Sequence, residues 1–175
     1  MRAEKTAIAR TQPSYPTSHF VKVLKRQGAK RILDWGCGRG RDVDWLTRQG
    51  YEVFGYDPHF KPVMPTGTYD AVICNYVLCV LPPDKRDDVF RLMLPHLKKD
   101  GLLCAAVRPK HEVDRWAKKS GWTKSWDGWE TGAGTFQKGY SKPEFFKVLD
   151  GHGFGNVVAS WCYSWTIAFM VRSGP

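Results

Sequence analysis

The residues best suited to chemistry form an acidic, glycine-rich segment in the first third of the chain. Asp34 opens the pattern D-x-G-x-G-x-G, and its three glycines are Gly36, Gly38 and Gly40. Glycines let the backbone turn sharply and approach a ligand closely. A carboxylate inside such a turn suits a ligand with an ammonium or sulfonium group. Asp57 follows Asp34 by 23 positions, where a carboxylate can accept both hydroxyls of a ribose.

A dinucleotide site is the close competitor for this turn. Its pattern, G-x-G-x-x-G, would need a glycine at Arg41 rather than at Gly40. Asp34 would also repel a pyrophosphate. The pattern therefore favours a nucleoside that carries a positive charge.

The segments around the turn predict a strand, a helix and a second strand. Residues 31–35 are a short apolar strand, residues 41–49 place apolar side chains on one helical face, and residues 51–56 form the next strand. This βαβ unit predicts a parallel pair. The turn then opens onto the positive end of the helix dipole.

The rest of the chain continues the alternation of helices and strands. The further predicted elements are a helix over 17–27, a buried strand over 68–78, a helix over 84–99 kinked at Pro95, a strand over 102–107, a capped helix over 141–151, and two closing strands that turn at Tyr163 and Ser164. Residues 111–140 begin with a short helix and continue as a Gly- and Trp-rich stretch, which predicts an ordered, lid-like insertion.

This order of motifs resembles the class I S-adenosylmethionine-dependent methyltransferases. The resemblance implies a Rossmann-like α/β fold, a mostly parallel sheet with a C-terminal antiparallel hairpin, and S-adenosylmethionine as cofactor. In that family the Asp34-like position lies beside the methionine moiety, and the Asp57-like residue binds the ribose. The cofactor-binding residues predicted here are Asp34, Gly36, Cys37, Gly38, Gly40, Asp57, Pro58, His59 and Asn75.

The chain departs from that family after its second strand. Relatives have a helix and a strand there, whereas only the 11 residues 58–68 intervene here, too few for both. We therefore expect a fold trimmed between the second and fourth strands. Apolar contacts are expected to replace the usual reader of adenine, from His59, Phe60, Val63 or Met64.

A closer resemblance covers most of the chain. The segments KTAIARTQPSYP, DWGCGRGRDVDWL, GYDPHF, NYVL and GTFQKGY are similar to small methyltransferases associated with DNA phosphorothioation. This resemblance implies a nucleic-acid partner.

Methyl transfer from a sulfonium is an in-line displacement, so a protein mainly positions the nucleophile and excludes water. The chain lacks the Pro-Pro-aromatic motif of amino-methyltransferases, and no Pro precedes a Cys as in C5-cytosine enzymes. The predicted catalytic residues are Tyr76, Arg108 and His111. Tyr76 lines the substrate pocket or packs in the strand, Arg108 clamps a phosphate or carboxylate, and His111 is a base or a solvated helix-start residue.

Basic residues gather at the two ends of the sequence. The chain has a net charge of +10, with +7 in residues 1–31, −1 in residues 32–100 and +4 in residues 101–175. Four tryptophans between 116 and 129 are interleaved with basic residues, which suits either base stacking or a satellite core. We expect methyl transfer to an anionic acceptor, nucleic acid or a nucleotide-like group. The alternatives are a small-molecule acceptor and a non-catalytic cofactor-binding module.

Composition limits the remaining possibilities. The 175 residues predict one domain, 1–175, with residues 1–28 as a basic arm and helix. The N-terminal residues lack the apolar core of a secretory signal, and no apolar run is long enough to span a membrane. The five cysteines contain no CxxC pair, so we expect buried thiols in the cytoplasm, with no disulfide and no metal.

Overall fold

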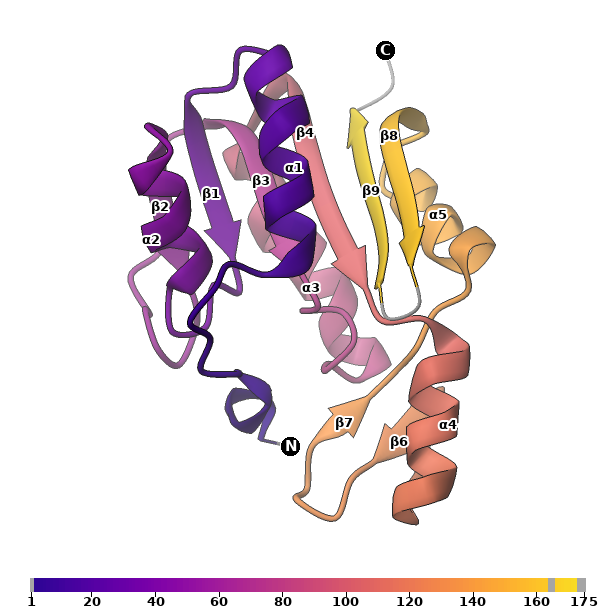
Figure 1. Ribbon diagram of the computed structural model, residues 1–175. Coiled ribbons are helices and arrows are strands. Elements are labelled where there is room, and N and C mark those ends of the chain that lie inside the picture. Colours follow the sequence, from indigo (N-terminus) through magenta and orange to yellow (C-terminus); the bar gives the residue numbers. More distant parts are fainter. Residues whose placement is uncertain (1, 164–165, 173–175) are drawn as a thin grey trace.

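A computed structural model describes residues 2–163 and 166–172, which fold around a six-stranded mixed sheet (Figure 1). The strand order is β2-β1-β3-β4-β9-β8. Neighbours among β2, β1, β3 and β4 run parallel, whereas β9 pairs antiparallel with both β4 and β8. The strands are β1 (Arg31–Trp35), β2 (Glu52–Tyr56), β3 (Tyr69–Asn75), β4 (Leu97–Val107), β8 (Asn156–Tyr163) and β9 (Thr166–Arg172).

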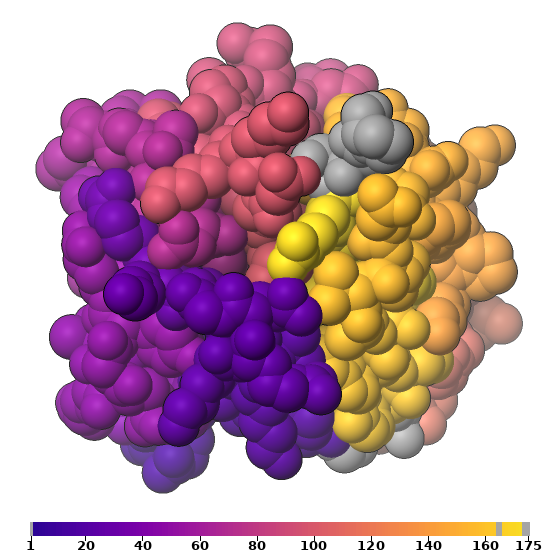
Figure 2. All heavy atoms as spheres, turned by 90° about the horizontal axis from the view of Figure 1, so that it is seen from above, coloured from indigo at the N-terminus to yellow at the C-terminus, as the bar shows by residue number. Residues whose placement is uncertain are grey.

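Helices cover both faces of this sheet and make a three-layer arrangement. The helices are α1 (Tyr15–Arg26), α2 (Arg41–Arg48), α3 (Pro83–Met93), α4 (Lys110–Ser120) and α5 (Lys142–Gly151). Helices α1 and α2 bury Phe20, Leu24 and Leu46 against one face. Helices α3 and α5 bury Phe90 and Phe145 against the other. Figure 2 looks along the strands and shows α1, in indigo, beside the C-terminal strands, where Phe20 meets Trp161 with ring centroids 5.7 Å apart.

Side chains alternate along each strand, so neighbouring residues contribute to the hydrophobic cores on opposite faces of the sheet. Ile32 lies in the core under α1, whereas its neighbour Leu33 lies in the core under α3. Because both faces are covered, β1, β3 and the second half of β4 are nearly continuous apolar runs. This explains why these strands could be predicted from hydrophobicity alone.

The sheet is trimmed after β2, as predicted. Strand β2 ends at Tyr56 and β3 begins at Tyr69, and the described residues between them form only an isolated bridge, Asp57 with Lys61. Strand β2 is therefore the edge of the sheet. The Rossmann-like α/β prediction is confirmed by the strand order and by the parallel pairs.

The prediction of one helix over 84–99 is wrong at its C-terminal end. Helix α3 ends at Met93, a 3-10 turn spans Leu94–His96, and Leu97 already belongs to β4. Pro95 has no N–H to continue the helix. Lys98 instead forms an ion pair with Asp70 of β3, with 2.7 Å between Nζ and Oδ1.

The lid-like segment is more regular than its composition suggests. After α4, the chain forms a three-stranded antiparallel sheet from β5 (Thr123–Ser125), β6 (Gly128–Glu130) and β7 (Phe136–Gln137). Figure 1 shows α4 and this small sheet at the carboxyl ends of the parallel strands, the edge where the N-terminal 3-10 turn (Ala3–Thr6) also lies.

The closing strands β8 and β9 form the antiparallel pair that the sequence predicts. Tyr163 ends β8, and the predicted turn residue Ser164 lies outside the described residues. Helix α5 has the predicted cap: the Ser141 hydroxyl accepts from the Glu144 N–H, and the Glu144 carboxylate accepts from the Ser141 N–H.

Asp70 ties together the amino ends of three strands. Burial raises its pKa, but hydrogen bonds from the Arg31 N–H, the Lys98 ammonium and the Lys30 N–H outweigh this and lower the pKa to about 2. The folded pKa is thus below the unfolded value near 3.9. The stabilisation is complete above pH 4 and is lost as the pH falls through 2.

We therefore predict that Asp70→Asn lowers the free energy of unfolding by about 1–2 kcal/mol at pH 7. Denaturant titrations from pH 7 to pH 2 should show a smaller loss of stability on acidification than in the wild type. Asp88→Asn is the control, because Asp88 pairs with Arg91 on an exposed helix face and should change stability little. Equal acid sensitivity of Asp70→Asn and the wild type would contradict this assignment.

Candidate active site

A cavity of about 780 Å³ opens at the carboxyl ends of the parallel strands. Its walls come from the N-terminal arm, the turn after β1, the loop after β2, the end of β3, helix α3, the end of β4 and strand β7. This volume lies in the range of small-molecule and cofactor sites. It is the place where a doubly wound sheet binds ligands.

The glycine turn forms one wall of the cavity, and its glycines let the backbone itself border the cavity. Gly36 has φ of +77°, and a Cβ on it would lie 2.3 Å from Cγ2 of Val77. The Gly36 and Cys37 N–H groups donate to the Tyr56 carbonyl at 2.7 and 3.0 Å. Gly40 has φ of +84° and starts α2. Only glycine satisfies both the backbone angle and the space at Gly36.

Asp34 is the most deeply buried acid of the site. It is 3% exposed, and its Oδ2 has no hydrogen-bond partner among the described residues. Burial raises the pKa of Asp34 well above its usual value, and the nearby negative charges of Asp42 and Asp57 raise it further. A buried carboxylate oxygen without a partner is costly, so a cationic ligand group would stabilise it.

Asp57 shapes the loop after β2. Its Oδ2 accepts from the Gly38 N–H at 3.1 Å, and its Oδ1 accepts from the His59 and Phe60 N–H groups at 2.9 and 3.0 Å. The carboxylate thus joins the glycine turn to the loop. It lines the cavity and retains lone pairs for a ligand hydroxyl.

The structure brings most of the predicted cofactor residues together. Those that line the cavity are Asp34, Gly36, Cys37, Gly38, Asp57, Pro58, His59 and Asn75. Gly40 does not line it and instead packs against the Lys61 side chain. Phe60 lines the cavity beneath the Arg39 guanidinium, 4.9 Å from the ring centroid. The prediction that Val63 or Met64 contacts the adenine is wrong. These side chains are 69% and 44% exposed and do not line the cavity.

Tyr76 and Arg108 also line the cavity. Tyr76 has φ of 63°, a strained value for a bulky side chain. Its N–H donates to the Ala106 carbonyl at 2.7 Å, and its hydroxyl lies 2.5 Å from Oγ1 of the buried Thr166. Burial raises the pKa of Tyr76. The phenol is therefore neutral at pH 7 and acts as a hydrogen-bonding group.

The structure does not place His111 in the site. It is the second residue of α4, its side chain is 70% exposed, and it does not line the cavity. The helix begins at Lys110 and directs the ring beside Glu112. Of the two roles predicted for His111, the general base is therefore wrong, and the solvated residue at the start of a helix agrees with the structure. Among the described residues that line the cavity, His59 is the single histidine.

Two residues that line the cavity, Asp42 and Gln137, are not among the site residues predicted from the sequence. Asp42 follows the glycine turn and lines the cavity, but an acid in the first turn of a helix reads as a favourable charge for the helix dipole. Gln137 lines the cavity from β7. Its neighbours Phe136 and Lys138 are buried on the other side of the strand, an alternation that a two-residue strand barely reveals.

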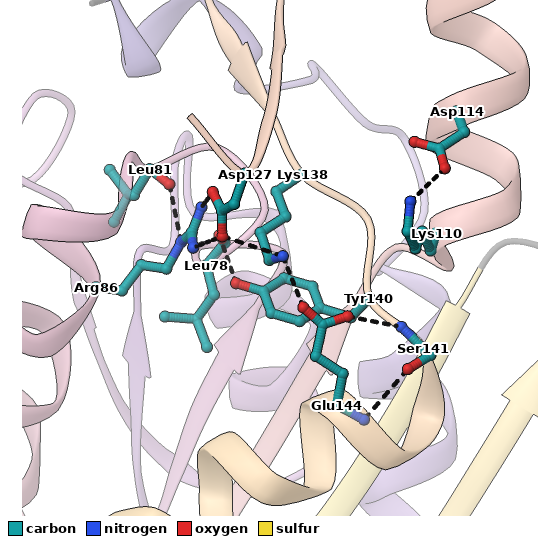
Figure 3. A network of polar contacts seen from close by, with 10 residues as sticks. All are labelled: Leu78, Leu81, Arg86, Lys110, Asp114, Asp127, Lys138, Tyr140, Ser141 and Glu144. Atoms are coloured by element: carbon teal, nitrogen blue, oxygen red, sulfur yellow. Dashed lines mark hydrogen bonds and ion pairs between the residues drawn. The ribbon is translucent and has the colours of Figure 1, made fainter. Parts of the chain in front are cut away.

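A network of charged side chains fixes the small sheet against the main domain (Figure 3). The Arg86 guanidinium donates to both carboxylate oxygens of Asp127 at 2.6 and 2.9 Å. Lys138, 8% exposed, lies 3.1 Å from Asp127 and 2.7 Å from Glu144. Its ammonium also lies 4.7 Å from the Tyr140 ring centroid. The insertion that carries Gln137 is therefore anchored to α3 and α5.

The described part of the chain has no cluster of three or more His, Cys, Asp or Glu side chains arranged to hold a metal ion. None of its helices is both long and apolar enough to cross a bilayer.

Most of the chain matches a known protein family. A family model described as "Methyltransferase domain" matches residues 9–158. The chain belongs to this methyltransferase family. A protein of Geobacillus sp. (strain WCH70) that is provisionally named a methyltransferase is 28% identical over 120 residues. The match covers 54% of this chain and 49% of that protein, so the chain spans about half the length of this curated relative.

Solved methyltransferases share the fold of this methyltransferase domain. The Burkholderia thailandensis 1,6-didemethyltoxoflavin-N1-methyltransferase, with S-adenosylhomocysteine bound, has a TM-score of 0.70 and 18% identity over 92% of this chain and 78% of its own. The Synechocystis PCC 6803 magnesium protoporphyrin IX methyltransferase, also with S-adenosylhomocysteine, has a TM-score of 0.66 and 16% identity over 98% and 93%. These likenesses confirm the class I methyltransferase fold.

The residues of the cavity fit S-adenosylmethionine. Asp34 and Asn75 each present a buried oxygen without a partner, which suits the cationic amino-acid end of that cofactor. The glycine turn leaves room for close approach, and Asp57 faces the same space. Phe60 and His59 offer rings beyond Asp57, where a nucleobase would lie.

We predict that Gly36→Ala weakens S-adenosylhomocysteine binding by at least tenfold, because the new methyl group collides with Val77 and moves the turn. Isothermal titration calorimetry measures the affinity. Gly50→Ala is the matched control: Gly50 also has positive φ, +91°, but a Cβ there meets no atom within 4 Å. Both variants should lose roughly 1 kcal/mol of stability because of the positive φ, and Gly36→Ala should lose more because of the collision with Val77. Similar affinities of the two variants would contradict the role of the turn.

The anchor of the small sheet gives another prediction. Lys138→Met should lower the free energy of unfolding by about 2–3 kcal/mol, because Asp127 and Glu144 lose their shared cation. The loss falls short of that for fully buried pairs, since both acids are 39% exposed. Chemical denaturation measures it, with Lys147→Met on the exposed face of α5 as control. A Lys138→Met protein as stable as the control would show that the network contributes little.

Proposed function

We propose that this domain transfers a methyl group from S-adenosylmethionine to a small anionic acceptor bound beside Tyr76. The observation that carries this proposal is a pair of guanidinium groups in the lining of the cavity. Arg10 from the arm and Arg108 from the end of β4 both line it. Neither has an ion pair among the described residues.

Electrostatics at Tyr76 support an anion site between the two arginines. Burial raises the pKa of Tyr76, and the positive charges of Arg10 and Arg108 both oppose that rise. Both guanidiniums belong to residues that line the same cavity as Tyr76, one from the arm and one from the end of β4. Arginine forks bind carboxylate and phosphate through paired hydrogen bonds. An acceptor carrying such a group would be held beside the Tyr76 hydroxyl.

The enclosure of the cavity supports a small acceptor. The N-terminal 3-10 turn and Ile8 line the cavity from above the strand ends, and the Arg2 N–H donates to the Gly134 carbonyl at 3.4 Å. The arm thus reaches the small sheet across the cavity. The neighbours named above act on small molecules according to their names, which are 1,6-didemethyltoxoflavin and magnesium protoporphyrin IX. A duplex would require the arm to move away.

The residues that line the cavity would bind the cofactor, orient the acceptor and exclude water. Bound S-adenosylmethionine supplies an already activated methyl group. Asp34, Asn75 and Asp57 would hold its charged and ribose ends, and Arg10 and Arg108 would orient the acceptor. An acceptor whose nucleophilic atom already presents a free lone pair needs no general base, and its anionic group stays bound to the arginines. The arm and the small sheet exclude water from the reacting end.

A nucleic-acid acceptor is the second candidate, and the surface of the insertion favours it. Trp116 and Trp126 are 42% and 63% exposed. The Lys119 ammonium lies 5.3 Å from the Trp116 ring centroid, and the Lys124 ammonium lies 4.3 Å from that of Trp129. Aromatic rings with nearby cations suit unpaired bases and phosphates. The resemblance to phosphorothioation-associated methyltransferases points the same way.

Labelled S-adenosylmethionine and a cell extract divided by size test this proposal. We predict that the label enters the small-molecule fraction and is retained on an anion-exchange resin. Arg108→Ala should reduce the rate of labelling by about tenfold to a hundredfold, because charged hydrogen bonds contribute about 1.5–3 kcal/mol. Arg108→Lys should retain part of the rate, and S-adenosylhomocysteine affinity should stay unchanged. Arg48→Ala, an exposed arginine at the end of α2, is the control.

Other outcomes would assign the activity differently. Label in the nucleic-acid fraction, lost when Trp116 and Trp126 are replaced by alanine, would support the second candidate. S-adenosylhomocysteine binding without labelled product in either fraction would support a non-catalytic cofactor-binding module. Equal rates for Arg108→Ala and the control would overturn the anion site.

A further inference from the structure

Three buried polar side chains and one half-buried amide form a network at the wall of the cavity. They are Ser14 and Thr17 at the start of α1, Asp42 in the first turn of α2, and Asn75 at the end of β3. Ser14, Thr17 and Asp42 are 3%, 0% and 9% exposed. The Asp42 carboxylate accepts from the Ser14 N–H at 2.6 Å, the Ser14 hydroxyl at 2.5 Å and the Thr17 hydroxyl at 2.7 Å.

This network fixes which way the Asn75 amide faces. Its Nδ2 donates to Oγ1 of Thr17 at 2.8 Å and to Oγ of Ser14 at 3.1 Å, and it lies 3.4 Å from Oδ2 of Asp42. Because both hydroxyls already donate to Asp42, only their lone pairs face Asn75. A flipped amide would set its oxygen against those lone pairs and against the Asp42 carboxylate. The network therefore holds Oδ1 on the opposite side.

Oδ1 of Asn75 then points away from the network, and Asn75 and Asp34 both line the cavity. Both Oδ1 of Asn75 and Oδ2 of Asp34 are buried without a partner, and both residues line the cavity. In the parallel pairing of β1 and β3, Asp34 lies opposite Ile73, and Asn75 is two residues further on. The side chains of Asp34 and Asn75 thus leave the same face of the sheet. Two unpaired acceptors on one face need a donor that carries several N–H groups.

We propose that Asp42, with Ser14 and Thr17, is a positioning residue for cofactor recognition. It holds Asn75 so that Oδ1 joins Oδ2 of Asp34 in accepting hydrogen bonds from the ammonium of the cofactor's amino-acid moiety. The ammonium has three N–H donors and neutralises part of the surrounding negative charge. This inference rests on the cofactor part of the proposed function and is independent of the acceptor.

Two ligands separate this role from a general structural one. S-adenosylhomocysteine carries the amino-acid moiety, whereas 5′-methylthioadenosine retains the nucleoside and the thioether but lacks that moiety. Asn75→Leu should weaken S-adenosylhomocysteine about tenfold to a hundredfold in calorimetry and leave methylthioadenosine within about twofold. Displacement of S-adenosylhomocysteine measures the affinity of methylthioadenosine where direct titration is too weak.

Asp42→Asn is the decisive variant, because it keeps the shape of the side chain and removes its charge. It should weaken S-adenosylhomocysteine about threefold to tenfold without a comparable effect on methylthioadenosine. Asp44→Asn on the exposed face of the same helix should change neither affinity. Thr17→Val replaces Asp42→Asn if the latter does not fold, since it removes one hydroxyl of the network at nearly constant volume. A parallel loss of both affinities, or no loss of either, would overturn the proposal.

Discussion

The carboxylate of Asp42 is the constraint on which the arrangement of the site depends. A charge removed from water is costly unless hydrogen bonds compensate it, and here the compensating donors come from the start of α1 and from Asn75. Three segments that are distant in the sequence must therefore meet before this carboxylate can be buried. The arm that covers the cavity leaves directly from Ser14, so its path begins at the same carboxylate.

The charged residues that line the cavity include acids beside the glycine turn and two arginines near Tyr76. Asp34, Asp42 and Asp57 surround the glycine turn, whereas Arg10 and Arg108 flank Tyr76. The acids at the glycine turn come from the nearly neutral middle of the sequence, and these two arginines come from its basic flanks. Opposite charges on one cavity wall suit ligands of opposite charge at neighbouring positions.

Sequence reasoning succeeded where structure depends on local backbone chemistry. The glycine turn needs residues without side chains, and the central strands need continuous apolar runs, so Asp34, Gly36 and β3 could be recognised directly. It failed where tertiary contacts decide. Residues 97–99 continue a helical pattern but join β4, because Pro95 stops the helix and Asp70 attracts Lys98. The burial of Asp42 depends on hydroxyl partners 28 and 25 residues away, which no local pattern reveals.

No strand of the described residues lies between β2 and β3, and a single side chain, Asp57, both shapes the loop there and lines the cavity. A loop without its own ladder of hydrogen bonds takes its shape from Asp57, which accepts from Gly38 in the turn and from His59 and Phe60 in the loop. Asp57 also lines the cavity. Glutamate would keep the charge but place it one methylene further out. A substitution at Asp57 would therefore alter both the path of this loop and the lining of the cavity, a double constraint that comes with the edge position of β2.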